Sequence, residues 1–363
     1  MPLNAFEGAG NSAPAPADAP EAQAVLSTLT TSAAFLVVSV RDMPGAEARV
    51  AGVVADVGSL VRAVGFRQSE AGLTCVVGLG SHYWDRVRPP GAPRPVQLHP
   101  FRAIRGTRHD APATPGDVLF HIRANRRDLV FELTRQVVDA LGADVRIEDH
   151  TVGFRYFDSR DLLGFVDGTE NPTGRGAAEV GLIAAADEPD FVGGSYVIVQ
   201  KYLHDLAAWN AMSTEEQERI IGRTKLDNIE LGDDIQPSNS HVSLNTIVDE
   251  EGVEHDILRD NMAFGDPATS EYGTYFIAYA ADPAVTELML ERMFVGAPAG
   301  NFDRILDVST AVTGTLFFVP SLELLESLAS TADAPAVTAA DEPPSNTSPP
   351  DDLAIGSLRG VRQ

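Results

Sequence analysis

Two stretches of the chain, 117–138 and 273–294, have the same order of elements, and this repeat constrains the fold more than any other feature. Each begins with strand-like residues, continues through a polar break and ends in an amphipathic helical pattern. In the first stretch, Leu129, Leu133 and Val137 fall on one face of the expected helix. We therefore expect the chain to contain two related halves.

Hydrophobic strands at 33–40 and 195–202 begin the two halves, and helix-like sequence follows each. After the second strand, Ser213 precedes Thr-Glu-Glu-Gln, the pattern of an N-cap and an acidic first turn, and Pro283 lies near the start of a later helix. The order strand, helix, strand, strand, helix, strand, found twice, predicts an α+β fold with antiparallel sheets. No Gly-x-Gly-x-x-Gly or Walker loop indicates a doubly wound parallel sheet instead.

The ends of the chain differ in composition from its body. The first twenty or so residues are rich in Ala, Pro, Gly and Asn, and the segment after residue 330 is rich in Pro and acidic, with no aromatic residue. We expect a flexible arm at 1–25, domains at 26–152 and 153–329, a disordered linker at 330–350 and a separate short segment at 351–363.

This last segment contains Leu353, Ile355 and Leu358 among small and polar residues. A short apolar segment at the end of a tether cannot fold alone. It is either a frayed terminus, or its apolar side chains bind the protein's own body or a groove on a partner.

Charge and cysteine content exclude several classes of protein. The 363 residues include 27 Lys and Arg against 52 Asp and Glu, a formal net charge of −25, which argues against generic binding to nucleic acid or an anionic membrane. Cys75 is the only cysteine, so an intrachain disulfide, a Cys-rich zinc site and a CxxCH haem attachment are excluded. No basic residue precedes Arg41, as a secretory signal would require, and no apolar run is long enough to span a membrane. We expect a soluble cytoplasmic protein.

The densest motif is GFVDGTENP at 164–172. Gly164 and Gly168 on either side of Asp167 allow tight turns and a close approach of the backbone to a bound group. An Asp in a short GxxDG pattern is most often a turn-former, whereas the full nine residues are far more specific.

Two further polar groups follow along the chain. His241, in SNSHVSLN, is placed by the alternation at the start of a strand, where an imidazole is either a structural residue or a metal ligand. Arg259 and Asn261, in ILRDNM, are two residues apart and share one face if extended, although Arg259 alone would be read as a surface ion-pair partner.

GFVDGTENP, His241, ILRDNMAFG and TAVTGTLFFVPS (310–321), in this order over about residues 155–325, resemble the dye-decolourising peroxidase family, in particular its bacterial B-type branch. The resemblance implies duplicated ferredoxin-like domains and a non-covalent haem b between the sheet and the helices of the second half. It also implies a set of site residues: His241 as the proximal iron ligand, Asp167, Arg259 and Asn261 on the distal face, Arg223 beside a haem propionate, and either Asp303 or Asp307 orienting His241.

The activity implied by the resemblance is reduction of hydrogen peroxide through an oxoferryl intermediate, with oxidation of dyes and phenolic or lignin-like compounds. Asp167 would move a proton between the peroxide oxygens and Arg259 would stabilise the developing charge, and which of them dominates is left open. Some B-type members also oxidise manganese(II), for which the nearby carboxylates are Glu170, Glu230 and Glu254. In a chain this acidic, three solvated surface carboxylates are the simpler interpretation of these residues. Trp84, Trp209 and the seven tyrosines are possible radical relays, but core packing is the simpler interpretation of each.

The terminal segment LAIGSLRG (353–360) resembles the cargo-loading peptide that docks such peroxidases inside encapsulin nanocompartments. This resemblance implies an encapsulin shell protein as partner, bound through residues 352–360. We also expect a homo-oligomer. A haem carrier or iron-recovery protein of the same fold, without turnover, is the alternative, and the presence of both Asp167 and Arg259 favours the enzyme.

Overall fold

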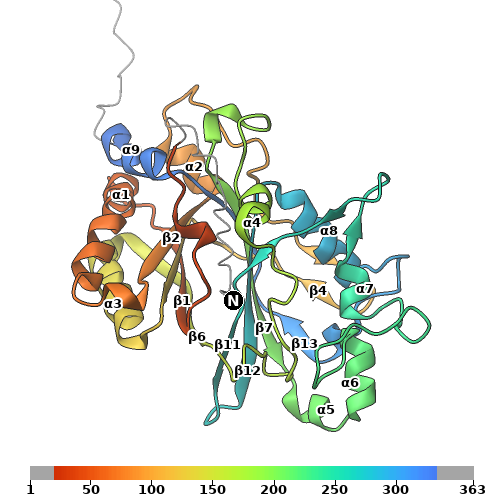
Figure 1. Cartoon of the computed structure of the whole chain (residues 1–363). Helices are drawn as coiled ribbons and strands as arrows, with labels where there is room; N and C mark the ends of the chain where they lie inside the picture. The colour runs from red at the N-terminus through yellow and green to blue at the C-terminus, as the bar shows by residue number, and fades with distance from the viewer. Residues whose placement is uncertain (1–19, 333–363) are drawn as a thin grey trace, which may run out of the picture. The chain divides into compact units, whose positions relative to one another are not determined.

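The computed structural model describes residues 20–332, and Figure 1 shows how their helices and strands are arranged. The main elements of the N-terminal half are β1 (Ser32–Val40), α1 (Ala46–Gly65), β2 (Thr74–Gly80), α2 (Ser81–Val87), β5 (Val118–Ala124), α3 (Arg127–Leu141) and β6 (Val145–Phe154). A small two-stranded sheet, β3 (Ile104–Arg105) and β4 (Asp110–Ala111), precedes β5.

The C-terminal half repeats this plan with more short elements. Its strands are β7 (Ser195–His204), β8 (Ile247–Val248), β9 (Glu254–His255), β10 (Leu258–Arg259), β11 (Met262–Asp266), β12 (Glu271–Ala280), β13 (Ser309–Ala311) and β14 (Thr315–Val319). Its α-helices are α4 (Gly174–Gly181), α5 (Leu206–Asn210), α6 (Thr214–Ile221), α7 (His241–Asn245), α8 (Pro283–Phe294) and α9 (Leu322–Ala332).

The two halves have the same strand order. In the first half the order is β6-β1-β5-β2, which is fourth, first, third, second along the chain, and every pairing is antiparallel. In the second half the four long strands along the chain are β7, β11, β12 and β14, and their order in the sheet is β14-β7-β12-β11. This order is again fourth, first, third, second, and the short strands β10 and β13 pair with β12 and β7, respectively. The expected duplicated α+β fold with antiparallel, ferredoxin-like sheets is confirmed.

The two sheets join into one closed ring of strands. β6 meets β11 at a single pair, Phe154 with Ala263, and β2 meets β14 at two pairs. Because side chains alternate across a strand, each sheet has one face inside this barrel and one outside. On β1, Phe35 and Val37 belong to the interior cluster, whereas Leu36 and Val38 pack in the cluster that includes the buried residues of α1 and α3.

Helices cover the outer faces of the strands (Figure 1). α1 and α3 contact the first sheet, and α8 contacts β12 and β7 of the second. The expected helix starts are confirmed, since Ser213 caps α6 by accepting a hydrogen bond from the Glu216 N–H, and α8 begins at Pro283. Leu129, Leu133 and Val137 form part of the buried face of α3, as their spacing predicts.

Residues 23–25, at the end of the arm expected over 1–25, are packed on the body. Gln23 donates its Nε2 to the carbonyls of Val77 and Pro320, and its Oε1 accepts the Val77 N–H at 2.8 Å. The folded body therefore begins before residue 26, and at the other end α9 continues to Ala332. The terminal segment 351–363 lies outside the described residues. Within 20–332, no helix is both long enough and apolar enough to cross a membrane.

Candidate active site

A cavity of about 210 Å³ lies in the C-terminal half, on the outer face of the second sheet. Side chains of β12 alternate between its two faces: Thr274 and Phe276 line the cavity, whereas Tyr275 and Ile277 face the barrel interior. α7, α8 and the loop around GFVDGTENP supply the other walls, and most of the lining is apolar. This is the place between sheet and helices that the family resemblance implies for haem.

His241, Asp167, Arg259, Asn261 and Arg223 all line this cavity, although they come from separate parts of the chain. The structure therefore brings these five predicted residues together from the loop after β6, the loop after α6, α7, and the segment around β10.

His241 begins the short helix α7, so the expected strand start is wrong. The reason is local: the Ser240 side chain accepts the Ser243 N–H at 3.2 Å, which makes Ser240 an N-cap and starts a helical turn. Asn245, one turn later, donates its side chain to the His241 carbonyl at 2.7 Å. The imidazole therefore projects from a capped helix end.

Asp303, and not Asp307, orients His241. The Asp303 side chain is 0% exposed, its Oδ2 lies 2.7 Å from His241 Nδ1, and its Oδ1 accepts the Ile305 N–H at 2.9 Å. Asp307 lies instead 3.1 Å from His109 Nε2. With Nδ1 occupied, Nε2 of His241 makes no hydrogen bond with a described residue, and the side chain is 28% exposed on the cavity wall. This arrangement is typical of a histidine that binds a metal through Nε2.

The glycines of the motif are needed for its backbone. Gly164 and Gly168 have φ values of +92° and +78°, which side-chain-bearing residues rarely adopt. A Cβ at Gly164 would also lie 2.6 Å from Cε of Lys225. The two turns present Asp167 at the cavity, as the motif predicts.

Asn261 orients Asp167. Its Oδ1 accepts the Ile277 N–H at 3.1 Å, so its Nδ2 faces the other way and donates to Asp167 Oδ1 at 3.4 Å. Arg259 is held through its backbone, because the Asn171 side chain accepts the Arg259 N–H at 3.0 Å and donates to its carbonyl at 2.6 Å. Among the described residues no group pairs with the buried Nε of Arg259, so this cation is available to a ligand in the cavity.

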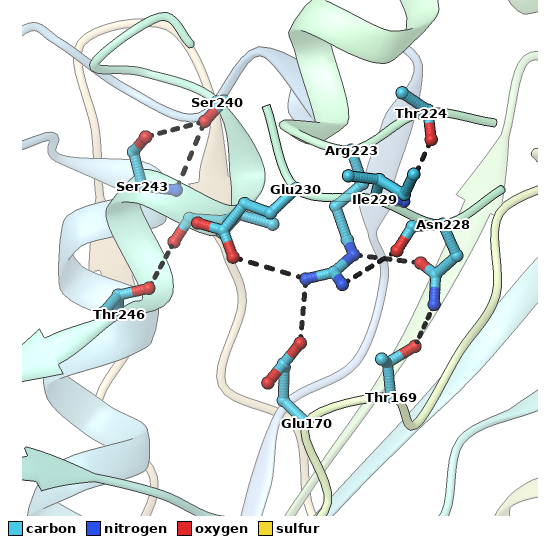
Figure 2. Close-up of polar contacts among 11 residues, drawn as sticks. Thr169, Glu170, Arg223, Thr224, Asn228, Ile229, Glu230, Ser240, Ser243 and Thr246 are labelled. Carbon is cyan, nitrogen blue, oxygen red and sulfur yellow. Dashed lines mark hydrogen bonds and ion pairs between the residues drawn. The ribbon is translucent and has the colours of Figure 1, made fainter. Parts of the chain in front are cut away.

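Arg223 is surrounded by acceptors (Figure 2). Its Nη1 lies 2.8 Å from Glu170 and 3.5 Å from Glu230, and Nε and Nη2 donate to Asn228. The Arg223 side chain is 15% exposed on the cavity wall, and its contact with a haem propionate stays a prediction. Glu254 also lines the cavity, but within residues 20–332 no three His, Cys, Asp or Glu side chains are grouped as a metal site.

Two other titratable groups of the cavity wall were missed by the sequence analysis. Burial, and to a lesser degree the charge of Asp167, raises the pKa of Asp161 to about 7, although three backbone hydrogen bonds oppose this shift. Burial lowers the pKa of His204 to about 4, and its two ring nitrogens lie 2.8 and 2.9 Å from the hydroxyls of Ser309 and Thr274. The sequence analysis also missed the role of Asn171, whose position directly before Pro172 in the motif was the available signal.

Trp84 and Trp209 are both almost completely buried. Trp209 donates its indole N–H to the Leu163 carbonyl at 2.9 Å and packs edge-on against Phe165, which lines the cavity. Trp84 belongs to the N-terminal half. Their possible use as radical relays stays a prediction.

The fold and the site together define a class of protein: two ferredoxin-like halves, of which the second has a pocket. In this pocket His241 Nε2 and Arg259 Nε have no hydrogen-bond partner among the described residues. Comparison with protein families identifies the class further. The model of the Dyp-type peroxidase N-terminal domain matches residues 22–155, and that of the C-terminal domain matches 158–324. The chain belongs to the Dyp-type peroxidase family and is a haem-dependent peroxidase.

Relatives match over most of the chain. A dye-decolorizing peroxidase of Mycolicibacterium paratuberculosis is 51% identical over 340 residues, covering 93% of both chains. DypB of Rhodococcus jostii RHA1 is 62% identical, with a TM-score of 0.82 over 84% of this chain and 97% of that one. A variant of that DypB has been solved in complex with heme, and a DypB variant, also 62% identical to this chain, in complex with manganese. The encapsulated DyP-type peroxidase of Mycobacterium smegmatis is 55% identical, with a TM-score of 0.81 over 85% of this chain and 98% of that one.

Proposed function

We propose that this haem peroxidase binds its haem iron through Nε2 of His241 and acts on hydrogen peroxide with Asp167, Arg259 and Asn261. The chain oxidises dyes and phenolic or lignin-like compounds with peroxide, as its family does. The relatives that cover most of the chain are named peroxidases, so a carrier without turnover is not favoured.

The observation that carries this assignment is that two nitrogens in one apolar cavity have no hydrogen-bond partner among the described residues. His241 has Nδ1 bound to a buried carboxylate and Nε2 free, which is the donor that haem iron requires. The buried Nε of Arg259 has no partner among the described residues, although an unpaired buried polar group is costly. A haem with peroxide bound at its iron would supply partners to both.

His241 would hold the haem, which would supply an iron site for peroxide and the electrons for its reduction. Asp303 accepts the Nδ1 proton of His241, which fixes the tautomer with Nε2 unprotonated and raises the basicity of that nitrogen. Asn261 donates to Oδ1 of Asp167, which leaves Oδ2 to accept a proton from the inner peroxide oxygen and return it to the outer one. Arg259, a permanent cation, stabilises the charge that develops on the departing oxygen.

The test is the absorption spectrum of the purified protein, alone and as His241→Ala. The wild-type protein is expected to show a Soret band and His241→Ala to lose it or to bind haem far more weakly. His109→Ala is the control, because His109 pairs with Asp307 outside the cavity and should keep the band. A full, unchanged Soret band in His241→Ala would show that another residue binds the iron.

We further propose that residues 352–360 dock the enzyme inside an encapsulin shell in the cytoplasm. Two facts support this: the pattern of Leu353, Ile355 and Leu358 on a Pro-rich tether, and the 55% identical relative that is itself encapsulated. Co-expression with the shell protein of the same organism tests it. The full chain should co-purify with the shell, and a chain lacking 351–363, or one with all three apolar residues changed to Ser, should not. Equal co-purification of the three would overturn the proposal.

The expected homo-oligomer is part of the same proposal, since a shell encloses its cargo at high local concentration. Light scattering of the purified enzyme at several concentrations measures the oligomer directly, and a monomer at every concentration would contradict it.

A further inference from the structure

An ion pair between the two halves is buried inside the barrel, on the opposite face of the second sheet from the cavity. Arg123 of β5 donates through Nη1 to Oδ2 of Asp260, and through Nη2 to the Ala24 carbonyl. The two side chains are 1% and 5% exposed. Asp260 lies in the chain between Arg259 and Asn261, the two residues assigned to peroxide, and the proposed mechanism uses neither Asp260 nor Arg123.

Residues 258–262 alternate between the two faces of the sheet. Leu258 and Met262 pack in the interior cluster of the barrel, and Arg259 and Asn261 line the cavity. Asp260 faces the interior with its neighbours at 258 and 262, where it meets Arg123. Because the side-chain period of a strand is two, a slip of one residue would exchange the two sets and remove both Arg259 and Asn261 from the cavity.

Backbone pairing alone specifies this register weakly. β10 has two paired residues and β11 five, and the pairs Arg259 with Ala278 and Met262 with Tyr275 show one continuous register across the gap between them. Within that gap the Asp260 N–H donates to the Ile277 carbonyl at 3.2 Å. The Ile277 N–H is bound by the Asn261 side chain and not by a backbone carbonyl, so one backbone link of the usual ladder is replaced by the site residue itself.

The ion pair is a poor choice for stability alone. Taking two charges out of water costs several kcal/mol, and replacing such a pair by apolar residues is often neutral or stabilising. Here the pair is also incompletely satisfied, because Asp260 Oδ1, Arg123 Nε and the neighbouring His121 Nε2 are buried without hydrogen-bond partners among the described residues. The pair does, however, make other registers unfavourable. In any register that turns Asp260 away from Arg123, the buried Arg123 charge loses its partner.

We propose that Asp260 is a positioning residue: its buried pair with Arg123 fixes the register of residues 258–262 and so keeps Arg259 and Asn261 at the peroxide site. None of the described residues of the N-terminal half, from residue 20 on, lines the cavity, so this half controls the geometry of the site from outside it. This inference rests on the proposed roles of Arg259 and Asn261.

The test uses the holoenzyme of the double variant Arg123→Met with Asp260→Leu, which removes both charges and leaves apolar side chains of similar size. Three quantities are measured: the melting temperature, the dissociation constant of cyanide from the ferric haem, and the second-order rate constant of the Soret change on mixing with hydrogen peroxide. We expect a melting temperature close to that of the wild type and a retained Soret band. We also expect weaker cyanide binding and a rate constant lower by on the order of tenfold to a hundredfold.

The matched control removes an ion pair within the N-terminal half, Arg86 with Asp117, whose atoms lie 2.8 Å apart and outside the cavity. Arg86→Met with Asp117→Asn should leave the rate constant unchanged. A purely structural role for Asp260 predicts that Asp260→Asn is unstable and that the double variant regains both stability and rate. A double variant that reacts within about twofold of the wild type therefore overturns the inference.

A separate readout does not require bound haem. The Ile277 amide proton should exchange with solvent faster in the double variant than in the wild-type apoprotein, because its partner Asn261 is no longer held in register. Unchanged protection at Ile277 would contradict the proposal even if the variant bound haem poorly. The variant Arg259→Leu separates the two claims: if it reacts like the wild type, the proposed function fails, and if it is slow while the double variant is normal, only the positioning role fails.

Discussion

The contact between His241 and Asp303 makes a quantitative prediction about the haem. Asp303→Asn keeps the size of the side chain and an oxygen that can still accept the Nδ1 proton, but it removes a negative charge 2.7 Å from the ring. Because that charge favours the more oxidised iron, its removal should raise the reduction potential of the haem.

The size of the shift follows from the hydrogen bond. A hydrogen bond to a charged group contributes about 1.5–3 kcal/mol and a neutral one about 0.5–1.5 kcal/mol, so the change loses about 1 kcal/mol of preference for ferric iron. For one electron, about 1.4 kcal/mol corresponds to 59 mV, so we expect the potential to rise by about 40 mV. Complete burial of Asp303 supports using the charged value in full.

Spectroelectrochemical titration of the Soret band measures this potential. Asp307→Asn is the matched control, since Asp307 contacts His109 and not His241 and should leave the potential unchanged. A shift smaller than about 10 mV in Asp303→Asn, a shift to lower potential, or an equal shift in the control would refute the reasoning.

Three further predictions concern the cavity wall. Since burial lowers the pKa of His204 to about 4, the unfolded chain takes up this proton first as pH falls. Up to about 3 kcal/mol of stability should therefore be lost between about pH 6.5 and 4, and urea titrations should show this loss reduced in His204→Gln. Burial raises the pKa of Asp161 to about 7, so its contribution has the opposite sign and is lost as pH rises from about 4 to 7. Asp161→Asn should therefore melt higher than the wild type above pH 7 and at about the same temperature at pH 4. Asn171→Ala removes both hydrogen bonds to the Arg259 backbone. This variant should react more slowly with peroxide and keep its Soret band. A normal rate would show that these two hydrogen bonds are not needed to position Arg259.

The repeated strand and helix pattern was sufficient to predict the fold because it depends on periodicity alone. The apolar face of α3 and the caps of α6 and α8 are local features, and the structure confirms them. Closure of the two sheets into a barrel depends on three residue pairs between distant strands, such as Phe154 with Ala263, which no local pattern reveals.

Motifs located the site residues, but not their neighbours. The alternation around His241 resembles a strand, and only the Ser240 cap turns it into a helix. The choice between Asp303 and Asp307 required the folded chain, because the two are four residues apart and about sixty residues from His241. Arg123 lies in the other half of the sequence from Asp260, so neither the pair nor its proximity to the cavity could be inferred from spacing.

The central claim is that Asp167 and Arg259 act on peroxide at a haem bound by His241. Stopped-flow mixing of hydrogen peroxide with the holoprotein of Asp167→Ala combined with Arg259→Leu tests it most directly. If the claim is correct, the double variant keeps its Soret band and its second-order rate constant falls by on the order of a hundredfold or more. A variant that holds haem and reacts at the wild-type rate would contradict the claim.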